Sequence, residues 1–279
     1  MAEGLSRDRL LGRDLARPFQ GVYVAKERAL SLQVLCDGLA RRLDPTAFFC
    51  GITAARLLGV PLPHRVESSP LIHVGVPSPR YRPVGRGLVG HAFAIAKDDI
   101  RTWSGLRLTS PERTWCDLSA VLSVSDLVAA GDYLIQWRLP MATPESLAAA
   151  TRAHAGQRGV TRARLALPFL DGRSESPQES RLRYLLVCAR LGELVANLPI
   201  TTSGGYRYRA DLAFPAHKVI IEYRSGFHDS PAAFRADMTR VSRLEADGWK
   251  VILVNGDDLD NPEELVGRIR RVLRARASR

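Results

Sequence analysis

Hydrophobic and polar residues follow two different periods in the last hundred residues of the chain, and these periods alternate in a regular order. Apolar spacing of three and four residues predicts a helix, and short apolar runs bounded by Gly, Pro or Asn predict strands. The predicted elements are helices at residues 176–192, 230–248 and 261–276, and strands at residues 193–200, 207–215, 218–224 and 249–255. This αβββαβα order predicts an α/β domain with a mixed sheet flanked by helices, because three sequential strands precede a helical crossover.

The first half of the chain mixes short helical and strand-like patterns, which predicts an α+β region. Alternation in residues 71–77, LIHVGVP, predicts a strand, and Ser110 followed by Pro111 predicts the start of a helix. Residues 152–175 are polar and basic at both ends, with one helical piece. We therefore expect three parts: an α+β region at 1–151, a linker with a helix at 152–175, and a second domain at 176–279.

The charge balance is basic, and most of the surplus lies in the first half. The 279 residues include 40 Lys and Arg against 29 Asp and Glu, a formal net charge of +11. Residues 1–174 hold 23 of the basic residues and 15 of the acidic ones, so the C-terminal part is closer to neutral. Such a surplus favours a polyanionic partner, either nucleic acid or an acidic membrane surface, but a GC-rich genome produces the same composition.

The sequence contains no sign of export or membrane insertion. Four cysteines occur without any CxxC pair, and this predicts buried free thiols in a reducing compartment and no zinc site. The N-terminal residues are charged and lack the apolar core of a signal peptide. No run of 18 apolar residues occurs, so we expect no membrane span and a cytoplasmic protein.

Two acidic residues of the predicted sheet lie opposite each other. A turn centred between Ala216 and His217 places Asp211 directly across from Glu222. Opposed side chains on one face of a sheet have Cβ atoms about 4.5–5.5 Å apart, and like charges there are destabilising. One candidate counter-charge is a divalent cation held by oxygen ligands. The other is the guanidinium groups of Arg209 and Arg224, which share that face and form a neutralising ladder with the two acids.

Glu179, at the start of the preceding helix, is a third acid of interest. Ser176 and Glu179 have the S-x-x-E spacing of a capping box, with Pro177 at the first helical position, and this account explains all three residues. Glu179 can also serve a site if the N-terminus of this helix points at the acid pair. The two roles are compatible.

Residues 176–273 resemble the PD-(D/E)XK nuclease superfamily, nearest to its very-short-patch-repair-like endonuclease branch. The segments that carry the resemblance are ESRLRYLL, YRADLAFP, VIIEYRSGFH and FRADMTRVSRLEADGWKVILVN. The resemblance implies a restriction-endonuclease-like core in which Asp211 and Glu222 hold Mg²⁺ or Mn²⁺ and Glu179 assists. It also implies that His228 contacts phosphate or shuttles protons, and that Arg240 points toward the active-site face rather than only pairing with Asp237. Arg209 is a further candidate contact to nucleic acid.

Arg224 occupies the position where the resembled family usually has a lysine. An arginine stays protonated and therefore cannot act as a general base. It can bind a phosphate group through two parallel hydrogen bonds and stabilise developing negative charge. Activation of water would then depend on the metal ion, which lowers the pKa of bound water.

Three segments between Phe19 and Ser119 resemble the AbiEi antitoxin-like region found in many actinobacterial proteins: FQGVYVA, CGITAARLLGVPLP and LRLTSPERTWCDLS. In that family a winged helix before the GVY strand binds DNA. Only about 18 residues precede the strand here, including one short helical piece, SRDRLLGR, so the winged helix is expected to be truncated. The histidines of this half have no metal-ligand spacing, and each is interpreted as structural or exposed: His64, His73, His91 and His154.

Three hypotheses for function remain. The first is a Mg²⁺-dependent endonuclease that acts on nucleic acid, with DNA preferred over RNA. The second is a non-catalytic, nucleic-acid-binding regulator of the antitoxin type with a degenerate nuclease fold. The third is a protein whose basic surface is compositional only, which predicts no salt-dependent affinity for nucleic acid.

Overall fold

A computed structural model describes residues 12, 14–26, 31–224 and 231–277, with the side chains of 231–234 excepted. The chain forms two compact units, which we describe separately. Unit 1 comprises Met1–Ala130 and Met141–Leu167, and unit 2 comprises Gly131–Pro140 and Pro168–Arg279. The helical piece expected before the GVY strand and the candidate His228 lie outside the described residues. The domain limits expected at 151 and 176 remain predictions.

Unit 2 contains the predicted αβββαβα order with one additional short helix, α11, so the expectation of an α/β fold with a mixed, helix-flanked sheet is confirmed. Its elements are α9 Pro177–Cys188, β8 Val195–Thr201, β9 Arg207–Phe214, η3 Pro215–His217, β10 Val219–Tyr223, α10 Pro231–Ala246, β11 Lys250–Val254, α11 Gly256–Asp260 and α12 Pro262–Ala277. The strand order in the sheet is β11-β10-β9-β8. Only β10 and β11 run parallel, because the crossover helix α10 joins them.

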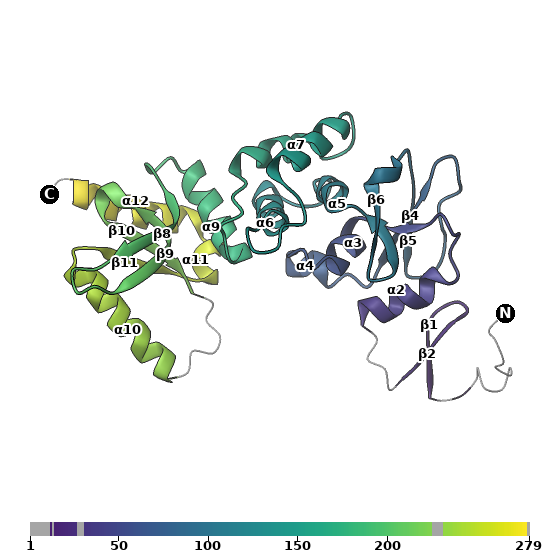
Figure 1. Ribbon diagram of the computed structural model, residues 1–279, viewed down its shortest axis with the longest axis horizontal. Coiled ribbons are helices and arrows are strands. Elements are labelled where there is room, and N and C mark those ends of the chain that lie inside the picture. The colour runs from purple at the N-terminus through teal and green to yellow at the C-terminus, as the bar shows by residue number, and fades with distance from the viewer. Residues whose placement is uncertain (1–11, 13, 27–30, 225–230, 278–279) are drawn as a thin grey trace. The chain divides into compact units, whose positions relative to one another are not determined.

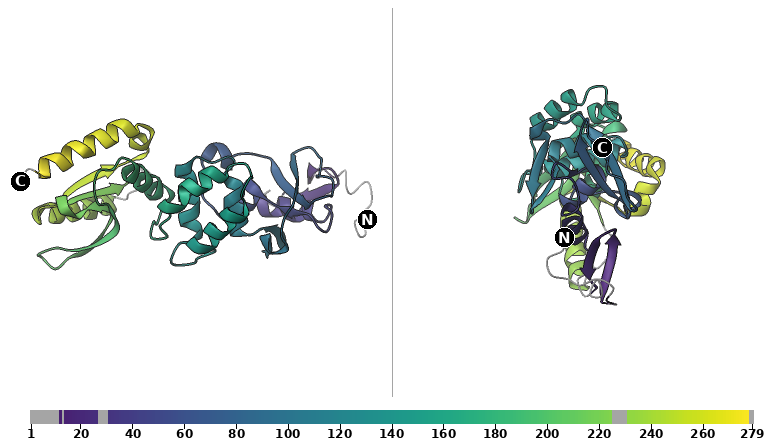
Figure 2. Two further views of the ribbon diagram at one scale, coloured as in Figure 1. Left: turned by 90° about the horizontal axis from the view of Figure 1, so that it is seen from above. Right: turned by 90° about the vertical axis from the view of Figure 1, so that its right-hand side faces the viewer.

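The two faces of this sheet are covered by different helices (Figure 1). One core cluster joins α9 and α12 to the sheet, with Leu182 and Ile269 fully buried against Phe214 and Ile221. The other face packs against α10 through Leu244. In the left view of Figure 2, the yellow helix α12 runs along the length of the sheet. The sheet is therefore a buried central layer, and a charged side chain that enters it needs a partner.

The β9–β10 hairpin has the register that the sequence predicts. Phe214 pairs with Val219, and Leu212 pairs with Ile221. The turn is the 3₁₀ segment η3, and Lys218 adopts a left-handed conformation with φ 50° before β10 begins. If this register is continued by one residue beyond the Leu212–Ile221 pair, Asp211 and Glu222 are neighbours at the end of the hairpin.

Helix α9 begins as predicted but ends earlier than expected. The Ser176 hydroxyl accepts a hydrogen bond from the Glu179 backbone N–H at 3.2 Å, and Pro177 occupies the first helical turn. The helix ends at Cys188 rather than at Gly192, because Arg190 has a φ of 50°, which a helix cannot continue.

Unit 1 is an α+β assembly, as expected. Its elements are β1 Leu15–Phe19, β2 Val22–Ala25, α2 Leu32–Ala40, β3 Phe48–Phe49, α3 Gly51–Leu57, α4 His64–Glu67, β4 Ile72–Pro77, β5 Leu88–Phe93, η1 Lys97–Asp99, β6 Ile100–Trp103, β7 Leu106–Thr109, α5 Pro111–Leu118, α7 Pro144–Ala153 and α8 Val160–Ala166. Helix α6 (Val124–Leu134) and segment η2 (Leu167–Phe169) contain points where the chain passes between the units.

The main sheet of unit 1 has the strand order β5-β4-β3-β7-β6, and β1 and β2 form a separate hairpin. The buried Trp115 of α5 anchors the helical part, and its indole N–H donates to the Leu127 carbonyl at 2.9 Å. Strands β4 and β5 are parallel, which places His73 and His91 on the same face of the sheet. Among the described residues, no helix is long and apolar enough to cross a membrane.

Candidate active site

Asp211 lies where the regular pairing of β9 with β10 ends and where its pairing with β8 is interrupted. The hairpin pairs end at Leu212 and Ile221, and one Asp211 carboxylate oxygen then accepts the Tyr223 backbone N–H at 3.1 Å. On the β8 side, the residue opposite Asp211 is Asn197, whose left-handed backbone has a φ of 54°. The side chain of Asp211 thus replaces a carbonyl as the acceptor for β10.

Three carboxylates interact at this position, and we call Glu179, Asp211 and Glu222 the acid cluster. The pKa of Asp211 is raised from 3.8 to about 6, first by burial and then by the negative charges of Glu179 and Glu222. The Tyr223 N–H and the Arg240 guanidinium oppose this rise in pKa without cancelling it. The acids that the sequence singled out therefore lie within electrostatic range of one another.

Glu222 is 2% exposed and is held by arginines. Arg240 donates to both of its oxygens, with Nη1 at 2.6 Å from Oε2 and Nη2 bonded to Oε1. Arg224 adds a longer contact to Oε2 at 3.3 Å. A buried carboxylate that forms a bidentate pair with a guanidinium group is one of the stronger charge pairs in proteins.

The arginine ladder expected from the hairpin is only half correct. Arg224 does contact Glu222, and it also pairs with Asp237 of α10. Arg209 instead pairs with Glu175, which precedes α9. The main counter-charge of the acid cluster is Arg240, because α10 crosses the sheet above Glu222 and the hairpin geometry contains no information on that helix.

Arg240 has the orientation that the nuclease resemblance implies, and it also keeps the local pair. Its Nη1 lies 3.7 Å from the Asp237 carboxylate, a contact three residues apart on one helix. The same side chain reaches Glu222 and the Arg209 carbonyl. Arg240 therefore belongs to the site as well as to the surface of α10.

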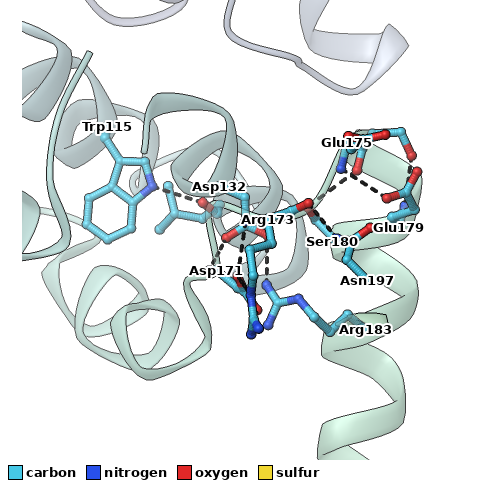
Figure 3. Close-up of polar contacts among 11 residues, drawn as sticks. Trp115, Asp132, Asp171, Arg173, Glu175, Glu179, Ser180, Arg183 and Asn197 are labelled. Carbon is cyan, nitrogen blue, oxygen red and sulfur yellow. Dashed lines mark hydrogen bonds and ion pairs between the residues drawn. The ribbon is translucent and has the colours of Figure 1, made fainter. Parts of the chain in front are cut away.

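Glu179 completes only half of the predicted capping box. Its backbone N–H is capped by Ser176, but its carboxylate accepts the N–H of Glu175, at 3.0 Å, rather than that of Ser176. Figure 3 shows Glu175 and Glu179 together at the start of α9. This arrangement leaves the Glu179 carboxylate close enough to Asp211 to raise its pKa.

A buried ion pair that the sequence did not indicate fixes α9. The Arg183 guanidinium donates to Asp132 Oδ2 at 2.7 Å, and the Asp171 N–H donates to Asp132 Oδ1 at 2.7 Å. Asp132 is 1% exposed, and Figure 3 draws it together with Asp171 and Arg183. The pair holds α9, and with it Glu179, against the segment 131–140 of the same unit.

Arginine and tyrosine side chains alternate beside the acid cluster, and we call Tyr206, Tyr208, Arg240 and Arg243 the arginine–tyrosine strip. The Arg243 guanidinium carbon lies 3.5 Å from the centre of the Tyr206 ring, and that of Arg240 lies 5.6 Å from the Tyr208 ring. Tyr206 is 45% exposed. Aromatic rings and arginines are the groups on which nucleic-acid bases and phosphates bind.

The donor chemistry of the acid cluster suits a hard divalent cation, because all three groups are carboxylates. A cation would also offset the repulsion from Glu179 and Glu222 that disfavours the ionised form of Asp211. The arrangement is not a formed metal centre. Within the described part of the chain, no group of three or more His, Cys, Asp or Glu residues is placed to hold a metal ion. Glu222 fits the donor set only when Arg240 releases it, since both of its oxygens are bonded to arginine.

The described residues thus define an α/β protein with a buried acid–arginine centre on the two central strands of a mixed sheet. Two proteins of Mycobacterium tuberculosis, described as uncharacterized protein MT2308 and uncharacterized protein Rv2248, are each 33% identical to this chain over 267 residues. The aligned region covers 93% of this chain and 92% of each relative, so the chain belongs to the same family as these two proteins. No family model and no solved structure matches the chain.

Proposed function

We propose that this protein is a metal-dependent nuclease that hydrolyses phosphodiester bonds, with DNA as its preferred substrate. The observation that carries the proposal is Asp211, whose pKa is raised to about 6 by burial and by two further carboxylates. Such a raised pKa in a cluster of acids is typical of sites that bind a cation or perform acid–base chemistry. The resemblance of residues 176–273 to the PD-(D/E)XK superfamily adds support from the sequence.

Asp211 and Glu222 would hold Mg²⁺ or Mn²⁺, with Glu179 completing or orienting the set. The bound ion would supply an activated water and charge stabilisation at the phosphate. Arg240 and Arg224 would release Glu222 and bind the phosphate of the substrate instead, since a guanidinium group binds carboxylate and phosphate in the same bidentate geometry.

Arg224 supports this exchange with an unfilled donor. Its Nε is buried and has no hydrogen-bond partner among the described residues, although its Nη2 contacts Glu222 and Asp237. Its backbone N–H donates to the Val254 carbonyl at 2.7 Å, which fixes the residue at the end of β10. A phosphate oxygen would satisfy the free donor.

The test is cleavage of end-labelled single- and double-stranded DNA and RNA by the full chain, with Mg²⁺, Mn²⁺ or EDTA. We expect metal-dependent cleavage by the wild type and loss of nearly all of it in Asp211→Asn and Glu222→Gln. The matched control is Asp247→Asn, an acid of the same unit that bonds Ser203 on the surface. If the wild type cleaves no substrate with either metal, and Asp211→Asn behaves identically, the nuclease proposal is wrong.

The bonding of Glu222 favours a second candidate, a non-catalytic nucleic-acid-binding regulator of the antitoxin type. In this case Arg240 and Arg224 neutralise Glu222 permanently, and the arginine–tyrosine strip binds the polyanion. Salt-dependent binding of DNA without cleavage, unchanged by Glu222→Gln, would support this candidate. If the protein showed no salt-dependent affinity for nucleic acid, its basic surface would reflect amino-acid composition alone.

A further inference from the structure

Unit 1 contains a pocket of about 330 Å³ that none of the chemistry described so far uses. This volume lies at the lower end of the range of small-ligand sites, about 300–1,000 Å³. The pocket is lined by ring-bearing, acidic and basic side chains that include His73, His91, Phe93, Asp117, His154 and Arg158. All of them belong to unit 1, and we call this cavity the ring pocket.

Two histidine rings of the ring pocket form a flat surface. His73 Nδ1 and His91 Nε2 are 3.2 Å apart, their ring centres are 5.4 Å apart, and their planes differ by 15°. A hydrogen bond between imidazole nitrogens lies near the ring planes, so this geometry places the rings edge to edge rather than face to face. The Phe93 ring is tilted by only 10° from His91 with centres 5.2 Å apart, which is too close for the two rings to share a plane, so Phe93 stacks against one face of His91.

This platform is fixed by the sheet beneath it. The parallel register of β4 and β5 pairs Gly75 with His91 and Pro77 with Phe93, so these side chains share a face with His73. Gly75 matters here, because a Cβ at that position would lie 2.5 Å from the Phe48 ring and 3.1 Å from the Phe93 ring. The Thr53 hydroxyl also accepts the His73 backbone N–H at 2.8 Å.

Asp117 gives the ring pocket an acceptor that lacks a donor. Its side chain is 11% exposed, and its Oδ1 accepts from Arg113 Nε at 2.9 Å. Its Oδ2 is buried and has no hydrogen-bond partner among the described residues. A buried acceptor without a partner is uncommon and energetically costly, and a ligand that carries an N–H group would satisfy it.

The histidines of the ring pocket are uncharged at neutral pH. Burial and the neighbouring His91 lower the pKa of His73 to about 4. Burial also lowers the pKa values of His91 and His154, helped by Arg82 and Arg113 respectively. The platform therefore acts as a neutral stacking surface rather than as a cationic anion site, and the exposed Arg158 supplies positive charge near the opening.

We propose that the ring pocket binds a nucleobase that carries an exocyclic amino group, such as guanine or adenine. The base would stack on the flat surface of His73 and His91, with Phe93 stacked behind His91, and its amino group would donate to Asp117 Oδ2. Arg158 would contact the attached phosphate. This base belongs either to a free nucleotide or to an unstacked position of a nucleic-acid strand, and the chemistry of recognition is the same for both.

The test is isothermal titration calorimetry of the full chain with GMP, AMP and UMP, and with the monophosphate of purine riboside, which has no donor on its base. We expect GMP or AMP to bind, and the purine riboside nucleotide and UMP to bind more weakly. Loss of the stacking ring in His91→Ala should weaken binding about tenfold. His64→Ala, which changes an exposed histidine of the same unit, should leave the affinity unchanged.

Two further variants keep the proposal falsifiable if His91→Ala fails to fold. His91→Phe preserves a flat ring and should retain binding. Asp117→Asn should remove the preference for an amino-bearing base, because its amide presents an NH₂ group as well as an oxygen. Equal binding of all four nucleotides, or no binding at millimolar concentration, would overturn the proposal.

The source of the base is distinguished by competition. A single-stranded oligonucleotide with one guanine should displace GMP if the ring pocket takes a base from a strand, and its abasic counterpart should not. Failure of both to compete assigns the pocket to free nucleotides. Asp211→Asn should bind GMP like the wild type, so this proposal stands or fails independently of the nuclease proposal.

Discussion

Arg240 donates to both carboxylate oxygens of Glu222, and this pair joins the crossover helix α10 to the central strand β10. Glu222 is 2% exposed, whereas the side chain of Arg240 is 21% exposed. The carboxylate is thus almost fully removed from water, and the guanidinium remains partly accessible. A competing anion can therefore approach Arg240 from solvent, while Glu222 depends on Arg240 for its charge balance.

Removal of Arg240 should destabilise the fold. Arg240→Gln leaves Glu222 with the single, longer contact from Arg224, and removing one partner of a buried pair costs about 3–5 kcal/mol. Urea unfolding followed by circular dichroism measures this loss in the free energy of unfolding. Arg243→Gln is the control, since Arg243 is a surface residue of the same helix and its loss should cost less than about 1 kcal/mol.

A second substitution separates charge from packing at this pair. Glu222→Gln combined with Arg240→Gln removes both charges, so the double variant should be more stable than Arg240→Gln alone. If the double variant is as unstable as the sum of the two single variants, the buried charge of Glu222 is not the cause of the loss.

Asp211 should make stability depend on pH in a defined direction. Its pKa rises from 3.8 to about 6 on folding, so its ionisation disfavours the folded state above pH 6, and this penalty disappears as the pH falls toward 4. Asp211→Asn should therefore raise the free energy of unfolding at pH 8, on the order of 1–2 kcal/mol, and have little effect near pH 4. Thermal unfolding at pH 4, 6 and 8 tests the direction.

The effect of a divalent metal ion on stability provides a second test of the role of Asp211. Mg²⁺ bound at the acid cluster should stabilise the wild type at pH 8 and do so less at pH 5, where Asp211 holds a proton. Asp211→Asn should show a smaller metal effect at both pH values. A metal effect of equal size in the two proteins would place the binding elsewhere.

The arginine–tyrosine strip should contribute to nucleic-acid affinity through charge. Arg243→Gln is expected to weaken DNA binding similarly for all sequences and to reduce the slope of log K against log salt by about 1. Fluorescence anisotropy at several salt concentrations measures both quantities. Lys250→Gln, an exposed basic residue that pairs with Glu245, provides the comparison. Equal slopes for wild type and Arg243→Gln would remove Arg243 from the interface.

The hairpin that places Asp211 near Glu222 could be predicted from the sequence because its information is local. The turn at Pro215–Lys218 sets the register, and the alternation of apolar residues sets the face. The start of α9 was predictable for the same reason, since Ser176 caps the backbone of a residue only three positions away. Local patterns therefore identified the acids of the cluster.

The partners of those acids could not be predicted in the same way. Arg240 reaches Glu222 across 18 residues because of the path of α10 over the sheet, and the spacing of Asp237 and Arg240 predicts only that they share a helical face. The ring pocket shows the same limit. His73 and His91 meet because β4 and β5 pair in parallel, and the spacing of the two histidines along the chain does not predict that pairing.

The buried pair of Asp132 and Arg183 should be essential for the stability of unit 2. Arg183→Met leaves Asp132, which is 1% exposed, without its cation, and this should cost about 3–5 kcal/mol at pH 8. Burial already raises the pKa of Asp132 despite Arg183, so removing Arg183 should raise it further. A carboxyl with a raised pKa takes up a proton as the pH falls, and the loss of stability should therefore be smaller at pH 5 than at pH 8.

Urea unfolding of Arg183→Met at these two pH values tests both the size and the direction of the effect. Arg190→Met, which changes an exposed arginine just after the same helix, should be nearly neutral. Adding Asp132→Asn to Arg183→Met removes the uncompensated charge, and it should restore part of the stability at pH 8 and little at pH 5. A pH-independent loss in Arg183→Met would mean that the methylene groups of Arg183, rather than its charge, hold α9 in place.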